Sequence, residues 1–175
     1  MIANDHFSVQ EYPGGIHVID AGYHREHMAA CYLMEAGSEA AFIEVGVNSS
    51  TPRLMKVLEN RGLEPGDVGF VIVTHIHLDH AGGAGSLMQL LPNATLLAHP
   101  YAARHMIDPA RLEAGSRAVY GDELFDRIYG KIIPVAKNRV RIMEDGEELK
   151  LGNRRLRFMD TPGHARHHFC VHDSL

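Results

Sequence analysis

The stretch 70–83, F-V-I-V-T-H-I-H-L-D-H-A-G-G, limits what this chain can fold into more than any other part of its sequence. Its first four residues are apolar and rich in β-branched side chains, which is typical of a buried strand. After Thr74, six residues carry four side chains that bind metals well: His75, His77, Asp79 and His80. The glycines at 82 and 83 follow, where the backbone can turn tightly or approach a ligand closely.

These four side chains favour a metal site at the end of the predicted strand. Imidazole nitrogen and carboxylate oxygen are ligands that zinc and similar metals use in open catalytic sites. The four groups cannot all point into a core, because an unpaired buried polar group costs free energy. A solvated, histidine-rich loop is the alternative, and the density of ligands argues against it.

The same residues resemble a known family. T-H-x-H-x-D-H-x-G-G at 74–83 is similar to the signature of the metallo-β-lactamase superfamily, and T-P-G-H at 161–164 matches its second signature. A third feature of the family is an apolar strand that ends in an acidic residue and glycine. Residues 41–46 fit this feature, with Glu44 where many members have aspartate. The resemblance implies an α/β fold, the αββα sandwich of the metallo-β-lactamase type.

The resemblance also implies a set of metal ligands. One metal is expected to take three histidines, here His75, His77 and His164, and a second metal is expected to take Asp79 and His80. Asp79 is the expected catalytic residue, because it would orient the attacking hydroxide and handle a proton. The implied cofactor is zinc, as two divalent ions in the complete domain, with iron or manganese as alternatives.

Further residues are predicted to lie near the site. His168 occupies the place of a second histidine that many relatives carry after T-P-G-H, and we expect it to neighbour the site without binding metal. In relatives, the loop that corresponds to 22–27 often overhangs the metals. Its side chains His24, Arg25 and His27 are therefore candidates for substrate binding, and a solvated hairpin is the alternative.

The sequence departs from the family at its C-terminal end. Relatives normally supply a bridging aspartate one strand after T-P-G-H and a last histidine near the C-terminus. Asp173 lies nine positions after His164 and directly follows a predicted strand, so we expect it in a hairpin turn. We therefore predict that residues 1–175 form one metallo-β-lactamase-like domain, the N-terminal portion of a longer one. One sheet face would then be exposed, to be covered by self-association or by the remainder of the domain.

The function that the resemblance implies is that of a metal-dependent hydrolase. A metal-bound hydroxide would attack a thioester, ester or lactone of a small substrate. A di-iron protein that reduces oxygen or nitric oxide is one alternative, although those relatives tend to have glutamate in place of His77. A catalytically incomplete binding or scaffold member is another, because two ligands are missing.

Composition limits the classes of binding partner and the cellular compartments that are expected for this chain. The formal net charge of −5 argues against a nucleic-acid partner. No apolar run approaches the roughly 20 residues of a membrane span, and residues 1–10 lack the features of a signal peptide. The two cysteines, Cys31 and Cys170, are predicted to be core thiols in a reducing cytoplasm. The expected partner is a small molecule.

The remaining pattern predicts alternating strands and helices. Strands are expected at 16–20, 31–35, 40–45, 94–98, 139–143, 148–151, 156–160 and 169–172. A helix is expected at 51–61, and helices from 101 to about 130 with breaks at Pro109 and Gly115. We expect Tyr120 and Tyr129 in the core and the arginines at 154, 155 and 157 in solvent. His99 and His105 match no family motif and are not predicted as ligands.

Overall fold

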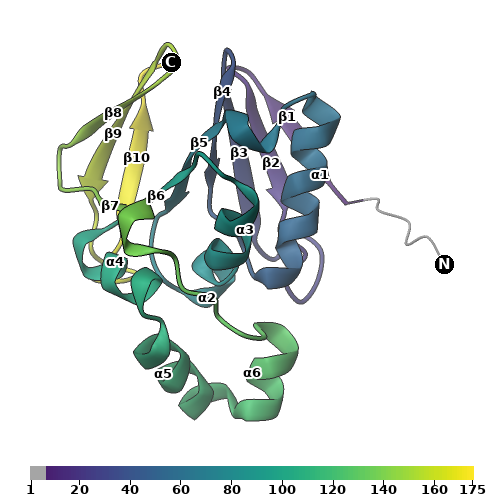
Figure 1. The fold of residues 1–175 in the computed structure, drawn as a ribbon, viewed down its shortest axis with the longest axis vertical. Coiled ribbons are helices and arrows are strands. Elements are labelled where there is room, and N and C mark those ends of the chain that lie inside the picture. The colour runs from purple at the N-terminus through teal and green to yellow at the C-terminus, as the bar shows by residue number, and fades with distance from the viewer. Residues whose placement is uncertain (1–6) are drawn as a thin grey trace.

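The computed structural model describes residues 7–175 as two β-sheets with helices packed against the larger one (Figure 1). Residues 1–6 lie outside the described residues. They are part of the stretch 1–10, for which the sequence predicts no signal peptide. The larger sheet has the strand order β1-β2-β3-β4-β5-β6-β7, antiparallel up to β4 and parallel from β4 to β7. Its strands are β1 (Val9–Tyr12), β2 (Ile16–Asp20), β3 (Ala30–Ala36), β4 (Glu39–Ile43), β5 (Val68–Val73), β6 (Thr95–Ala98) and β7 (Val140–Ile142).

The smaller sheet is antiparallel and has the order β10-β9-β8. Its strands are β8 (Glu148–Leu151), β9 (Arg154–Asp160) and β10 (Phe169–Asp173). In Figure 1 it lies at the left of the molecule, apart from the long strands of the larger sheet. The predicted α/β class is confirmed.

Alternation along the central strands divides the interior into two cores. In β5, Val71 and Val73 pack on the helix side, whereas Ile72 faces the smaller sheet. On that second side, the rings of Phe158 and Phe169 meet edge to face with centroids 5.0 Å apart. Because β5 is buried on both faces, its sequence is a continuous apolar run and not an alternating one.

Six α-helices are described: α1 (Thr51–Arg61), α2 (Leu78–Ala81), α3 (Ala84–Leu90), α4 (Pro100–Ile107), α5 (Ala110–Tyr120) and α6 (Asp122–Ile128). The prediction for α1 is correct. Its buried stripe of Leu54, Val57 and Leu58 faces the large sheet, and Gly62 ends it with a φ of 70°.

The helices after residue 100 differ from the prediction. The break at Pro109 is correct, but α5 runs through Gly115 and the chain turns instead at Gly121, where φ is 76°. A glycine inside a helix costs only about 1 kcal/mol relative to alanine, so Gly115 alone does not end α5. Tyr129 is buried as expected, whereas Tyr120 is 41% exposed and the core prediction for it is wrong.

The smaller sheet corrects three further predictions. Arg154 is buried rather than solvated, because alternation along β9 places it on the same side as Leu156 and Phe158. Its guanidinium pairs with Asp173, which is the last residue of β10 and not part of a hairpin turn. Cys170 is exposed, because it alternates with the buried Phe169.

The face of the larger sheet that was expected to be exposed is partly covered. Met34, Ile72 and Leu97 are buried beneath the smaller sheet, whereas Tyr32 and Ile43 are only half-buried. Among residues 7–175, no helix is long and apolar enough to cross a bilayer.

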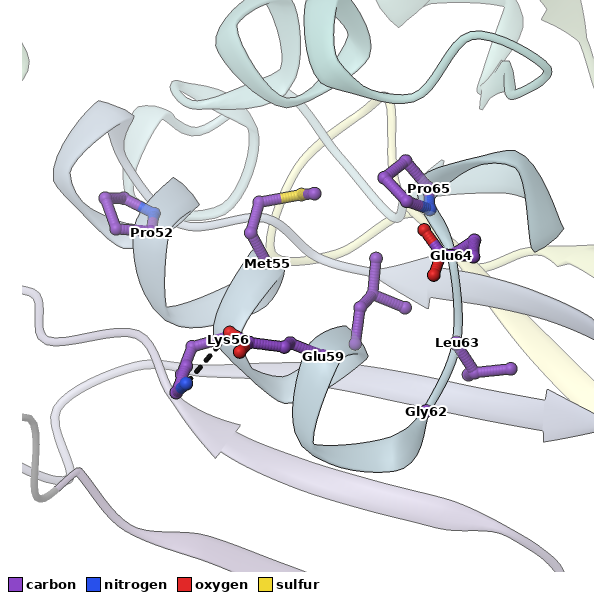
Figure 2. Close-up of a pocket in the computed structure, with 9 residues that line it drawn as sticks. Pro52, Met55, Lys56, Glu59, Gly62, Leu63, Glu64 and Pro65 are labelled. Carbon is purple, nitrogen blue, oxygen red and sulfur yellow. Dashed lines mark hydrogen bonds and ion pairs between the residues drawn. The ribbon is translucent and has the colours of Figure 1, made fainter.

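A cavity of about 500 Å³ lies beside α1 (Figure 2). Met55 and Glu59 of the helix and Leu63 and Pro65 of the following segment line it. An ion pair of 2.8 Å between Lys56 and Glu59 lies on its rim. None of the predicted metal ligands lines this cavity, so it is separate from the site described next.

Candidate metal centre

The carboxyl ends of three parallel strands place chemically active side chains at one edge of the larger sheet. Glu44 follows β4, His75 follows β5 and His99 follows β6. Loops at the carboxyl ends of parallel strands share one edge, where α/β folds bind ligands. The backbone N–H of Phe169 donates to the carbonyl of Thr74 (3.1 Å), which joins the smaller sheet to this edge.

The first motif passes from β5 into the short helix α2. His75 is 3% exposed, His77 directly precedes α2, and Asp79 and His80 lie within it. A Cβ atom at Gly83 would lie 2.7 Å from the carbonyl oxygen of Val47. This close backbone approach requires glycine, as the sequence suggested.

Three of the predicted ligands converge. The ligand atoms of His75, His77 and His164 all lie within 4.8 Å of one another, and His164 Nε2 is 3.0 Å from His77 Nδ1. Three nitrogens bound to one tetrahedral metal at 2.0–2.1 Å are about 3.4 Å apart. The three imidazoles are therefore close to a metal-binding arrangement, although they come from segments about 90 residues apart.

The orientation of His75 is fixed by its neighbour. Its Nδ1 lies 2.9 Å from Thr74 Oγ1 and is satisfied there. Its Nε2 is buried and has no hydrogen-bond partner within residues 7–175. An unpartnered buried nitrogen is unfavourable unless something binds it.

Glu44 completes a second group with His75 and His80, whose ligand atoms also lie within 4.8 Å of one another. Glu44 Oε2 is 2.5 Å from His80 Nδ1, and Glu44 Oε1 accepts a hydrogen bond of 2.7 Å from the backbone N–H of Thr74. Glu44 has a φ of 58°, a left-handed conformation that is rare outside glycine. The sequence marked Glu44 as a family feature but not as a site residue, and its signal was an acidic residue directly after an apolar strand.

The contact of Glu44 with His80 leaves the other ring nitrogen of His80 free for the second metal that the sequence predicts. Since Nδ1 faces Glu44, Nε2 is the nitrogen available to a metal. His80 Nε2 lies 3.4 Å from Asp79 Oδ2. The two ligands predicted for the second metal are therefore adjacent, and Glu44 orients one of them.

The protonation of the histidines suits metal binding. Burial, followed by the charges of His80 and His77, lowers the pKa of His75 from 6.5 to about 3. Burial and then His164 lower the pKa of His77 as well. Burial also acts to lower the pKa of His80, but the adjacent carboxylate of Glu44 outweighs it and the pKa is raised. At neutral pH, His75 and His77 are therefore neutral, the form that binds metals.

Two histidines after T-P-G-H flank this cluster. His168 Nδ1 lies 2.8 Å from Thr161 Oγ1, and its ring centroid is 5.4 Å from that of His75. His168 is therefore beside the cluster, where the sequence placed it. His167, which the sequence reasoning missed, stacks on His75 with centroids 6.4 Å apart and rings inclined by 13°. The only sequence signal for it was its place in a dense histidine segment.

The loop between β2 and β3 is organised by its own contacts. The carboxylate of Asp20 accepts hydrogen bonds from the backbone of Gly22 (2.8 Å) and His27 (3.1 Å). His24 packs against the ring of Tyr23 with centroids 4.7 Å apart. The described contacts do not join His24, Arg25 or His27 to the histidine cluster, and their role in substrate binding stays a prediction.

The donors described here fit a divalent metal of the zinc type. Three imidazoles are available to it, from His75, His77 and His164. A bound metal would also give the buried Nε2 of His75 the partner that it lacks within residues 7–175. Asp79 and His80 supply two further donors. The carboxylate of Glu44 behind His80 is the kind of partner that metal-bound histidines have.

Comparisons with known proteins agree with this geometry. The family model described as the metallo-beta-lactamase superfamily matches residues 17–175. A metallo-beta-lactamase fold-containing protein of Sulfurisphaera tokodaii is 29% identical over 161 residues, which are 90% of this chain and 58% of that protein. An acyl-coenzyme A thioesterase of Gallus gallus is 27% identical over 114 residues, which are 58% of this chain and 36% of that protein.

A solved structure shows the same fold. A mutant metallo-beta-lactamase from Cronobacter sakazakii superposes with a TM-score of 0.71 at 21% identity, covering 96% of this chain and 60% of that one. The chain thus spans little more than half the length of these proteins, and about a third of the thioesterase.

Proposed function

This chain belongs to the metallo-beta-lactamase superfamily, and we propose that it is a metal-dependent hydrolase acting on a thioester, ester or lactone of a small substrate. The observation that carries the proposal is the convergence of His75, His77 and His164 around a buried, unpartnered imidazole nitrogen. The similarity to a protein named as an acyl-coenzyme A thioesterase supports thioesters as the first substrates to test. Because the chain covers only part of its relatives, the activity of the whole protein is part of this proposal.

The proposal gives each residue of the cluster a role. His75, His77 and His164 would hold one divalent ion, which we propose to be zinc, and Asp79 with His80 would contribute to a second. When bound, such ions lower the pKa of water and polarise a carbonyl or phosphoryl oxygen. The carboxylate of Asp79 would accept and return a proton, and Glu44 would keep His80 in the tautomer that leaves Nε2 free.

Two alternatives lead to different results. A di-iron redox protein would bind iron in preference to zinc, and a binding or scaffold member would lack turnover. A cytoplasmic location and association with a second chain stay predictions.

Metal content tests the proposal most directly. The chain purified without chelator, His77→Ala and the control His172→Ala, which changes an exposed histidine, are compared by elemental mass spectrometry and by thioester and lactone hydrolysis. We expect one to two zinc ions per chain in the wild type and in His172→Ala, and one ion fewer in His77→Ala. Hydrolysis is expected to follow metal content. Equal metal in all three proteins, or metal without hydrolysis of any acyl substrate, would contradict the hydrolase.

A further inference from the structure

A cavity of about 640 Å³ lies beside the histidine cluster, between α4 and the turn after β9. Its lining combines an aromatic ring, two arginines, two histidines, one carboxylate and part of the T-P-G-H turn: Tyr101, Arg104, Arg166, His105, His167, Asp160 and Pro162. No step of the proposed hydrolysis uses this cavity.

One wall of the cavity adjoins the predicted metal ligands. The ring of His167 stacks on that of His75 at 6.4 Å and meets that of His77 edge-on at 5.8 Å. Pro162 belongs to the same short turn as His164. The cavity therefore begins one side-chain layer from the cluster, within reach of a second part of a substrate bound there.

The charge of the cavity is positive. Arg104 and Arg166 are exposed, and neither forms an ion pair with a carboxylate within residues 7–175. Arg104 Nε donates only to His105 Nε2 (3.1 Å). The single carboxylate of the lining, Asp160, lies 3.1 Å from His99 Nε2. Two guanidinium groups thus face one partly engaged carboxylate, in a chain whose net charge is −5.

We infer that this cavity binds an anionic group, a carboxylate or a phosphate, carried by the substrate at a distance from the bond that the metal centre cleaves. The inference rests on the proposed function and adds the charge of the substrate to it. Guanidinium groups bind carboxylates and phosphates through paired N–H donors. Tyr101, which is 65% exposed, offers a ring for the linking part of the same molecule. Contacts with a remote group of this kind position the reacting bond.

Binding of uncleavable thioethers tests the inference without relying on turnover. Three S-hexyl ligands share one alkyl chain: S-hexyl-N-acetylcysteamine is uncharged, S-hexylglutathione carries carboxylates and S-hexyl-coenzyme A carries phosphates. Their dissociation constants are measured by calorimetry with the wild type, Arg104→Ala/Arg166→Ala and the control Arg155→Ala. Arg155 is exposed and pairs with Glu148 on the smaller sheet, so its loss removes a positive charge from the protein without changing the lining of the cavity.

We expect the wild type and Arg155→Ala to bind at least one anionic ligand about tenfold more tightly than the uncharged one, and the double variant to lose this preference. Glutathione and coenzyme A then distinguish a carboxylate site from a phosphate site. Unchanged melting temperatures are expected, because both arginines are exposed. Equal or unmeasurable binding of all three ligands, or a preference that survives in the double variant, would overturn the inference. If the wild type prefers anionic ligands but hydrolyses no acyl substrate, only the proposed function is overturned. If it hydrolyses acyl substrates but shows no preference for anionic ligands, only the anion site is overturned.

Discussion

The two signature segments contribute to one cluster but are held there in different ways. His75 is 3% exposed, follows a strand buried on both faces and contacts Thr74 Oγ1 through its Nδ1. His164 is exposed and lies on the turn after β9. Its Nε2 lies 3.0 Å from Nδ1 of His77, which is itself a predicted ligand. The first segment is fixed by the core, and the second is positioned mainly by the strands that flank its turn.

Because of this difference, substitutions in the two segments should have different effects on the stability of the fold and on metal binding. We expect a change at His75 to alter both the stability of the fold and the binding of metal, because its side chain is buried at the end of β5. We expect a change at His164 to alter metal binding with little effect on the metal-free fold, because its side chain is exposed. The following predictions test this contrast, from the largest expected effect to the smallest.

Loss of a ligand from either segment should weaken zinc binding alike but affect folding differently. We expect His75→Ala and His164→Ala each to reduce zinc affinity by about 100-fold or more. The metal-free His75→Ala protein should lose about 2 kcal/mol of unfolding free energy, whereas His164→Ala should stay within about 0.5 kcal/mol of the wild type. Competition with a fluorescent chelator and urea denaturation measure the two quantities. Equal destabilisation by both changes would break the comparison.

Glu44 should affect both quantities without being a ligand itself. In Glu44→Gln the ion pair with His80 is lost while an acceptor for the Thr74 N–H remains. We expect zinc affinity to fall about 10- to 100-fold and the unfolding free energy to fall by up to about 2 kcal/mol. The control Glu59→Gln, which removes only the exposed pair with Lys56, should cost less than about 0.5 kcal/mol. A Glu44→Gln protein as stable as this control would show that the carboxylate does not tie the strands together.

Acid should destabilise the metal-free protein through His75. Its pKa in the folded protein, about 3, lies below the unfolded value of 6.5, so the unfolded state takes up the proton first. The stability present above pH 6.5 is therefore lost as the pH falls toward 3, by up to about 2 kcal/mol between pH 6.5 and 5.

His80 has the opposite sign. Its pKa is raised, so the stability it adds is fully present below its unfolded pKa and is lost as the pH rises through the folded pKa. It does not offset the acid loss below pH 6.5. Denaturation of the wild type and His75→Gln at pH 7, 6 and 5 measures the effect. The variant should show a shallower loss, and parallel curves would mean that His75 is not the group that titrates.

The hydrogen bond between Thr161 and His168 should matter least. Thr161→Val removes the hydroxyl that lies 2.8 Å from His168 Nδ1. We expect a loss of about 1 kcal/mol of unfolding free energy and a smaller loss of zinc affinity than in Glu44→Gln. Thr95→Val, a half-buried threonine of β6, is the matched control and should stay within about 0.5 kcal/mol. A larger loss of zinc affinity than in Glu44→Gln would contradict the prediction that this hydrogen bond matters least.

Local patterns in the sequence predicted those parts of the molecule that local chemistry controls. The apolar run of β5 and the stripe of α1 with its terminal Gly62 are formed by residues close together in the chain. The family and its α/β fold followed from two motifs whose residue types and order are visible without a structure. The five predicted ligands were named from the same motifs, and the structure brings three of them to one point.

Contacts between distant segments decided the rest. Glu44 became a site residue only because β4 and β5 are neighbours, which places its carboxylate against His80 and the N–H of Thr74. Arg154 is buried because Asp173 of the adjacent strand and the carbonyl of Glu35 satisfy its guanidinium. An arginine with such partners can be buried, whereas the sequence alone shows only a charged residue.

The sequence by itself therefore determined the family, the order of strands and helices around the first motif and the residue types of the candidate metal ligands. Each of these depends on residue types at short, fixed spacings. The tertiary structure alone decided which nitrogens remain free, which carboxylate orients His80 and where His167 and the two arginines form a charged cavity beside the cluster. Those features depend on distances between segments up to about 90 residues apart, which are set by strand pairing and the packing of two cores.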